Sequence, residues 1–259
     1  MGSCVSSART IPLDDIAIAI LGIDNAGKTC FLRSLAGDFN FDTVPSSGLG
    51  QESFMYDDVK LKVYDLGGGP KFRSVWQRFF AEIWGFIYVV DASDTERFEE
   101  SARVLKEITS HEMMKGKPYI VIANKQDLPN AVPAEKLKKT MKISKNIDVK
   151  DAAVIKVDGD KCNEGVSEST SALIGQILKK FEKIAKKRVV DMAKQEEIEN
   201  KEKAEKMERI KRMREEEAKK AEANEDEKEY SKSDKENSKS DKEDSKSDKE
   251  GSKSEHEEQ

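Results

Sequence analysis

The sequence predicts an α/β domain with a mostly parallel, six-stranded sheet flanked by helices, followed by a long charged helix and a disordered tail. Three observations lead to this prediction. A glycine-bounded phosphate-binding motif separates an apolar run from a helical pattern near the N-terminus. Apolar runs of strand length then alternate with helical stretches as far as residue 181. After that residue charged side chains dominate, and Tyr230 is the only aromatic residue.

Composition divides the chain into four segments. An N-terminal segment, residues 1–15, precedes the expected globular domain, residues 16–181. Residues 182–230 contain no glycine or proline, and glutamates alternate with lysines and arginines at helical spacing, which supports a helix without burial. Their apolar positions are too sparse for sustained heptads, so we expect a single helix and not a stable coiled coil. Residues 231–259 repeat a heptapeptide of the type SKSDKEN without apolar side chains, a composition typical of disorder.

Charge, cysteine content and hydropathy exclude several classes of protein. The net charge of −5 is mixed in sign along the tail, so the chain has no basic nucleic-acid footprint. There are three cysteines and no C-x-x-C pair, which fits a reducing cytosolic compartment and no disulfide framework. No apolar stretch approaches the about 20 residues that a membrane span needs, so any membrane contact must come from a group attached to the chain.

The N-terminus carries two coinciding lipidation signals. Residues 1–6 fit the pattern M-G-x-x-x-[ST], which directs myristoylation of Gly2 after removal of the methionine. Cys4 lies two residues away, where a palmitoyl chain could be added, and two acyl chains anchor a protein stably whereas one anchors it only marginally. The alternative is an unmodified, disordered terminus. Residues 7–15 hold little apolar material and would make a poor membrane-inserting helix.

The phosphate-binding motif has the structural context that it requires. Apolar residues over Ile16–Leu21 predict a buried strand, and Cys30–Leu35 have apolar residues at helical spacing. Between them, backbone N–H groups can turn onto phosphate oxygens, Lys28 can reach the β- and γ-phosphates, and the Thr29 hydroxyl can bind Mg²⁺. The alternative is an ordinary glycine-rich turn. The predicted nucleotide-binding residues of this motif are Gly22, Asp24, Asn25, Ala26, Gly27, Lys28, Thr29 and Cys30.

Two later loops have the composition of nucleotide-sensing segments. In residues 43–49 the hydroxyl of Ser46 lies beside proline and glycine, where it could complete a Mg²⁺ shell, although a plain turn fits equally well. Two strand-like runs follow, and the second ends in Asp65 just before the glycines of residues 67–69. A carboxylate at that point suits a Mg²⁺ site, and a glycine N–H such as that of Gly68 can meet a γ-phosphate.

An apolar stripe follows these glycines. Its members recur at helical spacing and are Phe72, Val75, Trp76, Phe79 and Phe80. Such a stripe either packs into the core or forms an aromatic face for a partner, since nucleotide-sensing loops flank it. Both interpretations can hold for different members.

A second motif indicates which base is bound. Strands are expected over residues 85–91 and 118–123, and the second ends in Asn124-Lys125-Gln126-Asp127. The aspartate can accept hydrogen bonds from the N1–H and the 2-amino group of guanine, whereas adenine lacks both donors and would leave the carboxylate unpaired. Asn124 can hold the base and tie back to the phosphate loop, while the Lys125 stem packs along the ring. The motif therefore indicates guanine.

The ordered motifs GIDNAGKT, TVPSSG, DLGGG and NKQDLPNA resemble the Arf-like branch of the small GTPases over residues 16–181. The GGG segment, Arg73-x-x-Trp76 followed by Ala81-Glu82, and the long charged helix are similar to the cilium-associated Arf-like thirteen subgroup. The resemblance implies the small-GTPase fold, GTP or GDP with Mg²⁺ as cofactors, and a lipid anchor at the cytoplasmic face of a ciliary or flagellar membrane. It also implies ciliary effectors and, in the GTP form, exchange activity toward another Arf-like GTPase that unloads lipidated cargo.

The resemblance also assigns roles to individual residues. Gly69 occupies the place of the glutamine that positions the attacking water, so very slow intrinsic GTP hydrolysis is expected. After a last expected strand, residues 152–157, the backbone around Gly159 and Asp160 would support the base, although a carboxylate there departs from the family pattern. By the same resemblance, phosphates are contacted by Lys28, Mg²⁺ is bound by Thr29, Ser46 and, through water, Asp65, and guanine is recognised by Asn124, Lys125 and Asp127.

The sequence leaves several functions open. The favoured one is a nucleotide-gated switch; a self-sufficient hydrolase and a structural module that no longer switches are the others. Gly69 argues against the hydrolase, and intact Lys28, Thr29, Asp65 and Asp127 argue against the module. Within the GTPases, the alternatives to a ciliary role are a general Arf-like membrane-traffic GTPase and a nucleotide-locked scaffold whose charged helix is the interaction element.

Overall fold

The protein divides into two compact units, Met1–Glu196 and Glu197–Gln259. Each unit is considered by itself below. The six-stranded sheet, the flanking helices and the long helix that follows them confirm the fold predicted from the sequence. The computed structural model describes residues 15–38, 48–56, 59–155 and 162–247.

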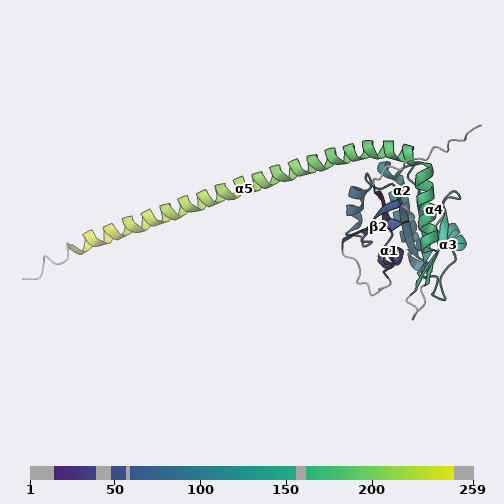
Figure 1. Ribbon diagram of the computed structural model, residues 1–259. Coiled ribbons are helices and arrows are strands. Elements are labelled where there is room, and N and C mark those ends of the chain that lie inside the picture. The colour runs from purple at the N-terminus through teal and green to yellow at the C-terminus, as the bar shows by residue number, and fades with distance from the viewer. Residues whose placement is uncertain (1–14, 39–47, 57–58, 156–161, 248–259) are drawn as a thin grey trace, which may run out of the picture. The chain divides into compact units, whose positions relative to one another are not determined.

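The first unit is built on a sheet flanked by helices (Figure 1). The strand order in this sheet is β2-β3-β1-β4-β5-β6. Only β2, which pairs with β3, runs antiparallel to its neighbour in this sheet. The strand order reverses at β1, and open α/β sheets bind ligands outside the carboxyl ends of the strands at such a point. The strands are β1 Ile16–Leu21, β2 Leu49–Tyr56, β3 Val59–Leu66, β4 Gly85–Asp91, β5 Tyr119–Asn124 and β6 Val149–Asp151.

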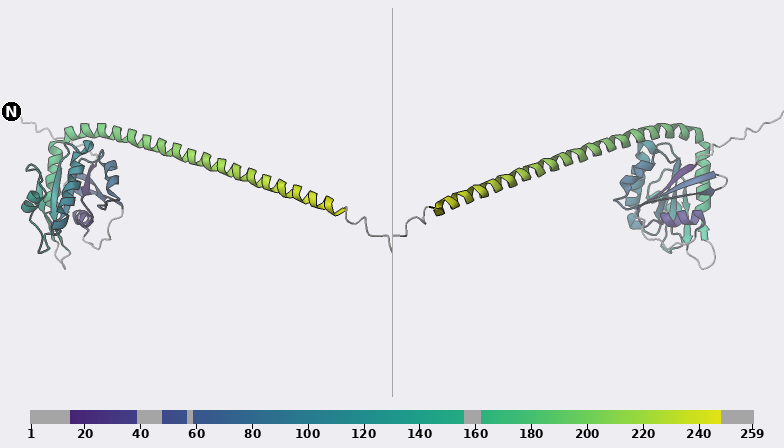
Figure 2. Two further views of the ribbon diagram at one scale, coloured as in Figure 1. Left: turned by 180° about the vertical axis from the view of Figure 1, so that it is seen from behind. Right: turned by 60° about the vertical axis from the view of Figure 1, so that its left-hand side comes forward.

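Helices cover both faces of this sheet (Figure 2). The side chains of β4 alternate between the faces. A Cβ at Gly85 would lie 3.3 Å from Leu173 of the helix α4, whereas the hydroxyl of Tyr88 donates to the backbone oxygen of Ser101 in α2, 2.9 Å away. The helices are α1 Lys28–Ala36, α2 Phe98–Ser110, α3 Ala134–Thr140, α4 Val166–Lys179 and α5 Phe181–Ser247, with 3-10 turns η1 Arg73–Phe79, η2 Thr95–Arg97 and η3 Glu112–Met114, and a separate hairpin of β7 Ala153–Ile155 and β8 Cys162–Glu164.

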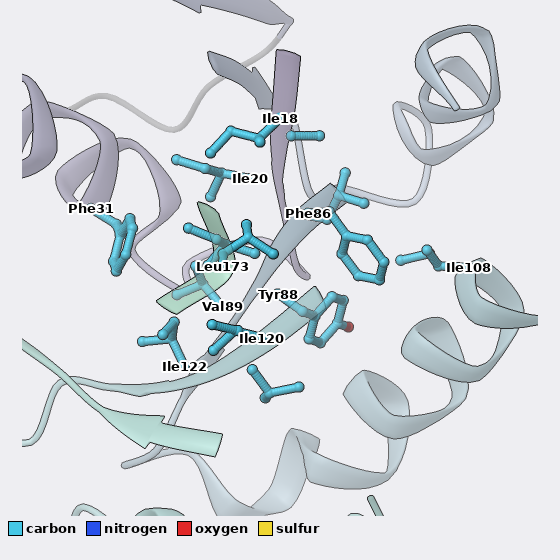
Figure 3. Close-up of a cluster of buried hydrophobic side chains, with 14 of the residues drawn as sticks. Ile18, Ile20, Phe31, Phe86, Tyr88, Val89, Ile108, Ile120, Ile122 and Leu173 are labelled. Atoms are coloured by element: carbon cyan, nitrogen blue, oxygen red, sulfur yellow. The ribbon is translucent and has the colours of Figure 1, made fainter. Parts of the chain in front are cut away.

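The core lies between the central strands and the helices on either side (Figure 3). Phe86 and Tyr88 lie on the side of Ile108 of α2, whereas Val89 lies close to Leu173 of α4. Strands β1 and β4 are buried along their whole length, as expected for parallel strands covered on both faces. This buried, continuous apolar frame fixes the carboxyl ends of the strands, where the candidate site lies.

The beginning of α5, as far as Glu196, belongs to the first unit and packs within it. Its Phe181 ring stacks on the indole of Trp84 with 4.6 Å between ring centroids, and the Arg188 guanidinium lies 4.2 Å from the same indole ring. The Nε of Arg188 also donates to the backbone oxygen of Glu82 at 2.6 Å. Ile184 is buried at this contact. The helix therefore starts on the segment that joins η1 to β4.

The rest of α5 belongs to the second unit, and its described side chains, which run to Lys220, form no buried face. Described side chains after Glu197 are exposed, apart from Glu199 and Ile210, which are half-buried. The helix continues to Ser247 and so extends beyond residue 230, where the sequence analysis had placed its end. Lysines and acidic residues alternate in the repeat, and no glycine or proline occurs before Gly251, so nothing in the composition ends the helix earlier. Among the described helices, none has the length and hydropathy needed to cross a membrane.

Candidate nucleotide-binding site

The predicted phosphate loop lies between β1 and α1, at the reversal of strand order. Two positions of this loop require glycine, because neighbouring atoms lie too close for a side chain. Gly22 has a φ of 146°, and a Cβ there would lie 2.3 Å from the backbone oxygen of Val89. Gly27 has a φ of 87°, and a Cβ there would lie 2.3 Å from Nδ2 of Asn124. The loop ends at the N-terminus of α1, where unpaired N–H groups and the helix dipole favour an anion.

Lys28 is the first residue of α1, and its ammonium is enclosed by the loop. The side chain is buried, and Nζ donates to the backbone oxygen of Ile23 at 2.9 Å. Burial lowers the pKa of Lys28 to about 8, and the negative charges of Asp65 and Asp24 only partly oppose this shift. A polyanion in the loop would favour the charged ammonium, which is the chemistry expected of a phosphate-binding lysine.

Thr29 and Asp65 form the arrangement expected of a magnesium site. Ile20 of β1 pairs with Asp65 of β3. The carboxyl end of β3 therefore lies beside that of β1, close to the start of α1. Thr29 Oγ1 donates to Asp65 Oδ2 at 2.6 Å, and Asp65 Oδ1 is buried without a hydrogen-bond partner among the described residues. A buried carboxylate oxygen needs a compensating ligand, and oxygen ligands suit Mg²⁺. These two residues fit the ion; the third predicted ligand, Ser46, lies outside the described residues.

The two glycines after Gly67 differ in what surrounds them. A Cβ at Gly68 would lie 2.4 Å from the backbone carbon of Ile23 and 2.5 Å from the nitrogen of Asp24, so only glycine lets this segment lie against the phosphate loop. A Cβ at Gly69 would meet only the Phe72 ring, at 3.5 Å, an ordinary contact. Glycine is therefore required by space at position 68 and not at position 69.

A network of four charged side chains joins the phosphate loop to η1 and α2. Arg97 binds Asp24 at 2.8 Å and Glu100 at 2.9 Å, and Arg73 binds Glu100 at 2.6 Å. Arg73 Nε also donates to the backbone oxygen of Gly68 at 2.9 Å. The hydrogen bond from Arg97 lowers the pKa of Asp24. Sequence reasoning missed this network: Arg97 and Glu100 are three positions apart, but no spacing rule links that pair to Asp24 in the phosphate loop or to Arg73 in η1.

The base-reading motif is tied to the phosphate loop. Asn124 is buried at the end of β5, and its Nδ2 donates to the backbone oxygen of Ala26 at 2.9 Å, the bond expected from the sequence. Its Oδ1 is buried without a partner among the described residues. Lys125 has a φ of 63° and pairs with Asp91 of β4 at 2.6 Å. Asp127 follows in the same turn with an exposed side chain.

The remaining predicted site residues divide by location. Asn25 has a φ of 62° in the phosphate loop, and Cys30 is half-buried in the first turn of α1. Gly159 and Asp160 lie outside the described residues, as do the lipidation candidates Gly2 and Cys4. The site as described thus gathers the phosphate loop, the Thr29–Asp65 pair, Gly68 and the Asn124 motif at one edge of the sheet.

The apolar stripe after the glycines separates into core and surface. Trp76 and Phe80 are buried, and the Trp76 indole N–H donates to the backbone oxygen of Gly67 at 2.9 Å. Val75 is exposed, and Phe79 is half-buried against the ring of Tyr64 at 4.7 Å between centroids. Trp76 therefore holds the glycine segment in place and Phe80 packs in the core, while Phe79 is partly and Val75 largely at the surface.

Comparisons with known proteins agree with this geometry. The model of the ADP-ribosylation factor family matches residues 5–177. ADP-ribosylation factor-like protein 13B of Chlamydomonas reinhardtii is 45% identical over 124 residues, which are 48% of this chain and 24% of that protein, so the chain spans about a quarter of its length. A solved structure titled Arl6 BBS3 small GTPase from Trypanosoma brucei, with the bound nucleotide analogue GppNp, has a similar fold, with a TM-score of 0.55 and 24% identity over 64% of this chain and 99% of that one.

Proposed function

The chain belongs to the ADP-ribosylation factor family of small GTPases, and we propose that it is a membrane-anchored, Arf-like guanine-nucleotide switch that acts in cilia or flagella. In its GTP form it recruits partners or promotes exchange on another Arf-like GTPase. The observation that carries the nucleotide assignment is the bond from Asn124 to Ala26, which joins a base-reading motif to a phosphate loop. That bond sets the separation between the two ends of one nucleotide.

The phosphates lie against the loop that begins at Gly22. Backbone N–H groups and the enclosed Lys28 ammonium bind the β- and γ-phosphate oxygens. Thr29 and, through water, Asp65 would hold Mg²⁺, with Ser46 as the third predicted ligand, and the ion would neutralise charge on those oxygens. A Cβ at Gly68 would lie 2.4–2.5 Å from backbone atoms of the phosphate loop, so the Gly68 segment lies directly against the loop and its position would depend on what the loop contains.

Guanine selectivity comes from Asp127. Its carboxylate accepts hydrogen bonds from N1–H and the 2-amino group, and adenine offers neither. The buried Oδ1 of Asn124 is an acceptor that the base can satisfy. The stem of Lys125, whose ammonium is held by Asp91, packs along the ring. By resemblance, the backbone around Gly159 and Asp160, which lie outside the described residues, would also support the base.

Hydrolysis is very slow in this proposal. Gly69 has no side chain to hold a water in line with the γ-phosphate. Arg73 lies beside the glycine segment, but its guanidinium is already bound to Glu100 and to the backbone of Gly68, so it does not take the place of the missing glutamine. The GTP state therefore persists until exchange, or until a partner supplies the missing groups.

Membrane attachment is proposed from the N-terminal motif and the ciliary setting from resemblance to the Arf-like thirteen subgroup. Acyl chains on Gly2 and Cys4 anchor the chain at the cytoplasmic face. Gly2→Ala should release the protein from membranes in cells, and Cys4→Ser should leave one chain and marginal binding. A Gly2→Ala protein that remained fully membrane-bound would refute this anchor.

The nucleotide assignment is tested by purifying the protein gently and identifying the released ligand by chromatography. Guanine nucleotide is expected. Release of adenine nucleotide, or equally tight binding of ATP and GTP, would contradict the proposal. A nucleotide-locked scaffold is the second candidate, because the described side chains of α5 after Glu197 are nearly all exposed and so accessible to a partner. Binding of the same partner with GDP and GTP would favour that candidate over a switch.

A further inference from the structure

The hydroxyl residues of the chain are distributed unevenly. No serine or threonine occurs between Ser171 and Ser231, a stretch that includes all of α5 before the repeat. Eight serines then occur between Ser231 and Ser254. Each of the eight has an aspartate or glutamate three residues later. The repeat therefore conserves a spacing between hydroxyl and carboxylate, and not merely a composition.

The two serines of each repeat differ in their surroundings. The first, such as Ser231, is followed directly by a lysine. The second, such as Ser233, is followed directly by Asp234 and, two residues further, by Glu236. Only the second serine thus has carboxylates one and three residues after it and no base between the hydroxyl and the nearer acid.

Elsewhere in the sequence, only Ser93 and Thr109 have an acidic residue three positions later. Both are engaged within the fold. Ser93 Oγ donates to Asp91 Oδ1 at 2.6 Å, and Thr109 Oγ1 donates to the backbone oxygen of Leu105 at 2.9 Å. The pattern thus occurs only twice in the globular part, where both hydroxyls already form hydrogen bonds. It is concentrated in the repeat at the end of the chain.

We propose that the repeat is a multisite substrate of an acid-directed serine kinase, with the second serine of each repeat modified first. These residues are Ser233, Ser240, Ser247 and Ser254. A serine Oγ attacks the γ-phosphorus of ATP, the bond from that phosphorus to the β,γ-bridging oxygen breaks, ADP leaves, and the hydroxyl proton passes to the base of the kinase. Basic groups of the kinase bind the two following carboxylates, which gives the enzyme its register on the repeat.

The described side chains of α5 that precede the repeat, from Glu197 to Lys220, are exposed apart from the half-buried Glu199 and Ile210. A helix with no buried face is stabilised only by its own hydrogen bonds and charge pairs, so local opening of its distal turns costs little free energy. Ser233, Ser240 and Ser247 lie in the last turns of α5, which ends at Ser247. Kinases can therefore engage the segment as an extended chain.

Phosphorylation opposes the helix that carries it. Each phosphate adds about −1.5 to −2 charges. On a helix, residues three and four apart are neighbours, so a phosphate on Ser240 lies beside Glu243 and Asp244. Negative charge is also unfavourable near the helix C-terminus. The acids that direct the kinase thus become repulsive neighbours of the product, and modification shortens α5 from its distal end.

The test uses the full chain, Mg²⁺-ATP and a purified kinase that requires an acid three residues after its serine. Mass spectrometry over time should show phosphate first on the second serine of each repeat, and none on Ser93 or Thr109. A variant with Glu236→Gln, Glu243→Gln, Glu250→Gln and Glu257→Gln should slow modification of those serines roughly tenfold or more, the loss expected when a charge-assisted contact is removed. Its matched control, Glu222→Gln, Glu225→Gln, Glu227→Gln and Glu229→Gln, has the same charge change and should react like the wild type.

Absence of phosphate in the wild type, equal rates at both serines of a repeat, or equal slowing in the control would overturn the proposal. Circular dichroism gives an independent readout. Helix content should fall after phosphorylation of the wild type and remain unchanged in a variant whose eight repeat serines are alanine. Unchanged helix content in the fully phosphorylated wild type would overturn the proposed shortening of α5.

Discussion

The residues that would hold a nucleotide and the residues that would cleave it are built differently in this protein. On the holding side, Gly22 and Gly27 are fixed by space, Lys28 is enclosed, and Asn124 ties the base-reading motif to the loop. Among the residues that would take part in hydrolysis, Gly69 has room for a Cβ, and the nearby Arg73 is already paired with Glu100. Nucleotide binding and GTP hydrolysis therefore depend on different residues. A glycine in place of glutamine at position 69 affects only hydrolysis.

The largest expected effect comes from the base-reading motif. Asp127→Asn replaces one of the two carboxylate oxygens by an NH2 donor, which would face a guanine N–H, and removes the negative charge, so it should weaken GTP binding by about 2–4 kcal/mol. Binding of a fluorescent guanine nucleotide, with Gln126→Ala in the same turn as control, measures this. If Asp127→Asn bound GTP as tightly as the wild type, the guanine assignment would be lost.

The next effect separates the two neighbouring glycines. Gly68→Ala places a methyl group 2.4 Å from the backbone of Ile23, whereas Gly69→Ala makes only an ordinary contact with Phe72. Overpacking against a backbone costs about 1–3 kcal/mol, so Gly68→Ala should weaken binding of a GTP analogue and Gly69→Ala should not. Equal affinities of the two variants would show that the segment does not approach the phosphate loop when nucleotide is bound.

A smaller effect should appear with pH. Burial lowers the pKa of Lys28 to about 8 in the nucleotide-free site, and bound phosphates should raise it again. Below that pH both states hold the proton, so affinity is constant. Above it, binding must take up a proton, and affinity should fall by up to about tenfold per pH unit. Calorimetry at about pH 9 in two buffers of different ionisation enthalpy should detect proton uptake, and its absence would contradict the enclosed ammonium.

The sequence predicted those parts of the site that depend on local chemistry. The phosphate loop, Asp65 and the Asn124 motif each lie at the carboxyl end of a strand, and parallel strands bring these ends to one edge of the sheet, so motif order was enough to place them together. The bond from Asn124 to Ala26 followed from the same reasoning and is present.

Other features depend on contacts between distant residues. The Asp24–Arg97 pair joins the phosphate loop to η2, and Arg188 bonds to Glu82, 106 positions earlier in the sequence. No residue pattern predicts contacts over such sequence separations. The apolar stripe could not be divided in advance, because helical spacing does not say that Trp76 is buried and Val75 exposed. The end of α5 was set too early, because charge pairing in the repeat supports a helix while its composition is that of disorder.

The most direct test of separable binding and turnover is single-turnover release of phosphate from protein preloaded with GTP. The wild type should release phosphate at close to the background rate and retain intact GTP, as read by chromatography of the bound nucleotide. Gly69→Gln, whose Cβ would make only an ordinary contact with Phe72, should hydrolyse GTP faster while binding it equally well. A wild-type rate equal to that of glutamine-bearing relatives would contradict the account, because another group would then position the attacking water.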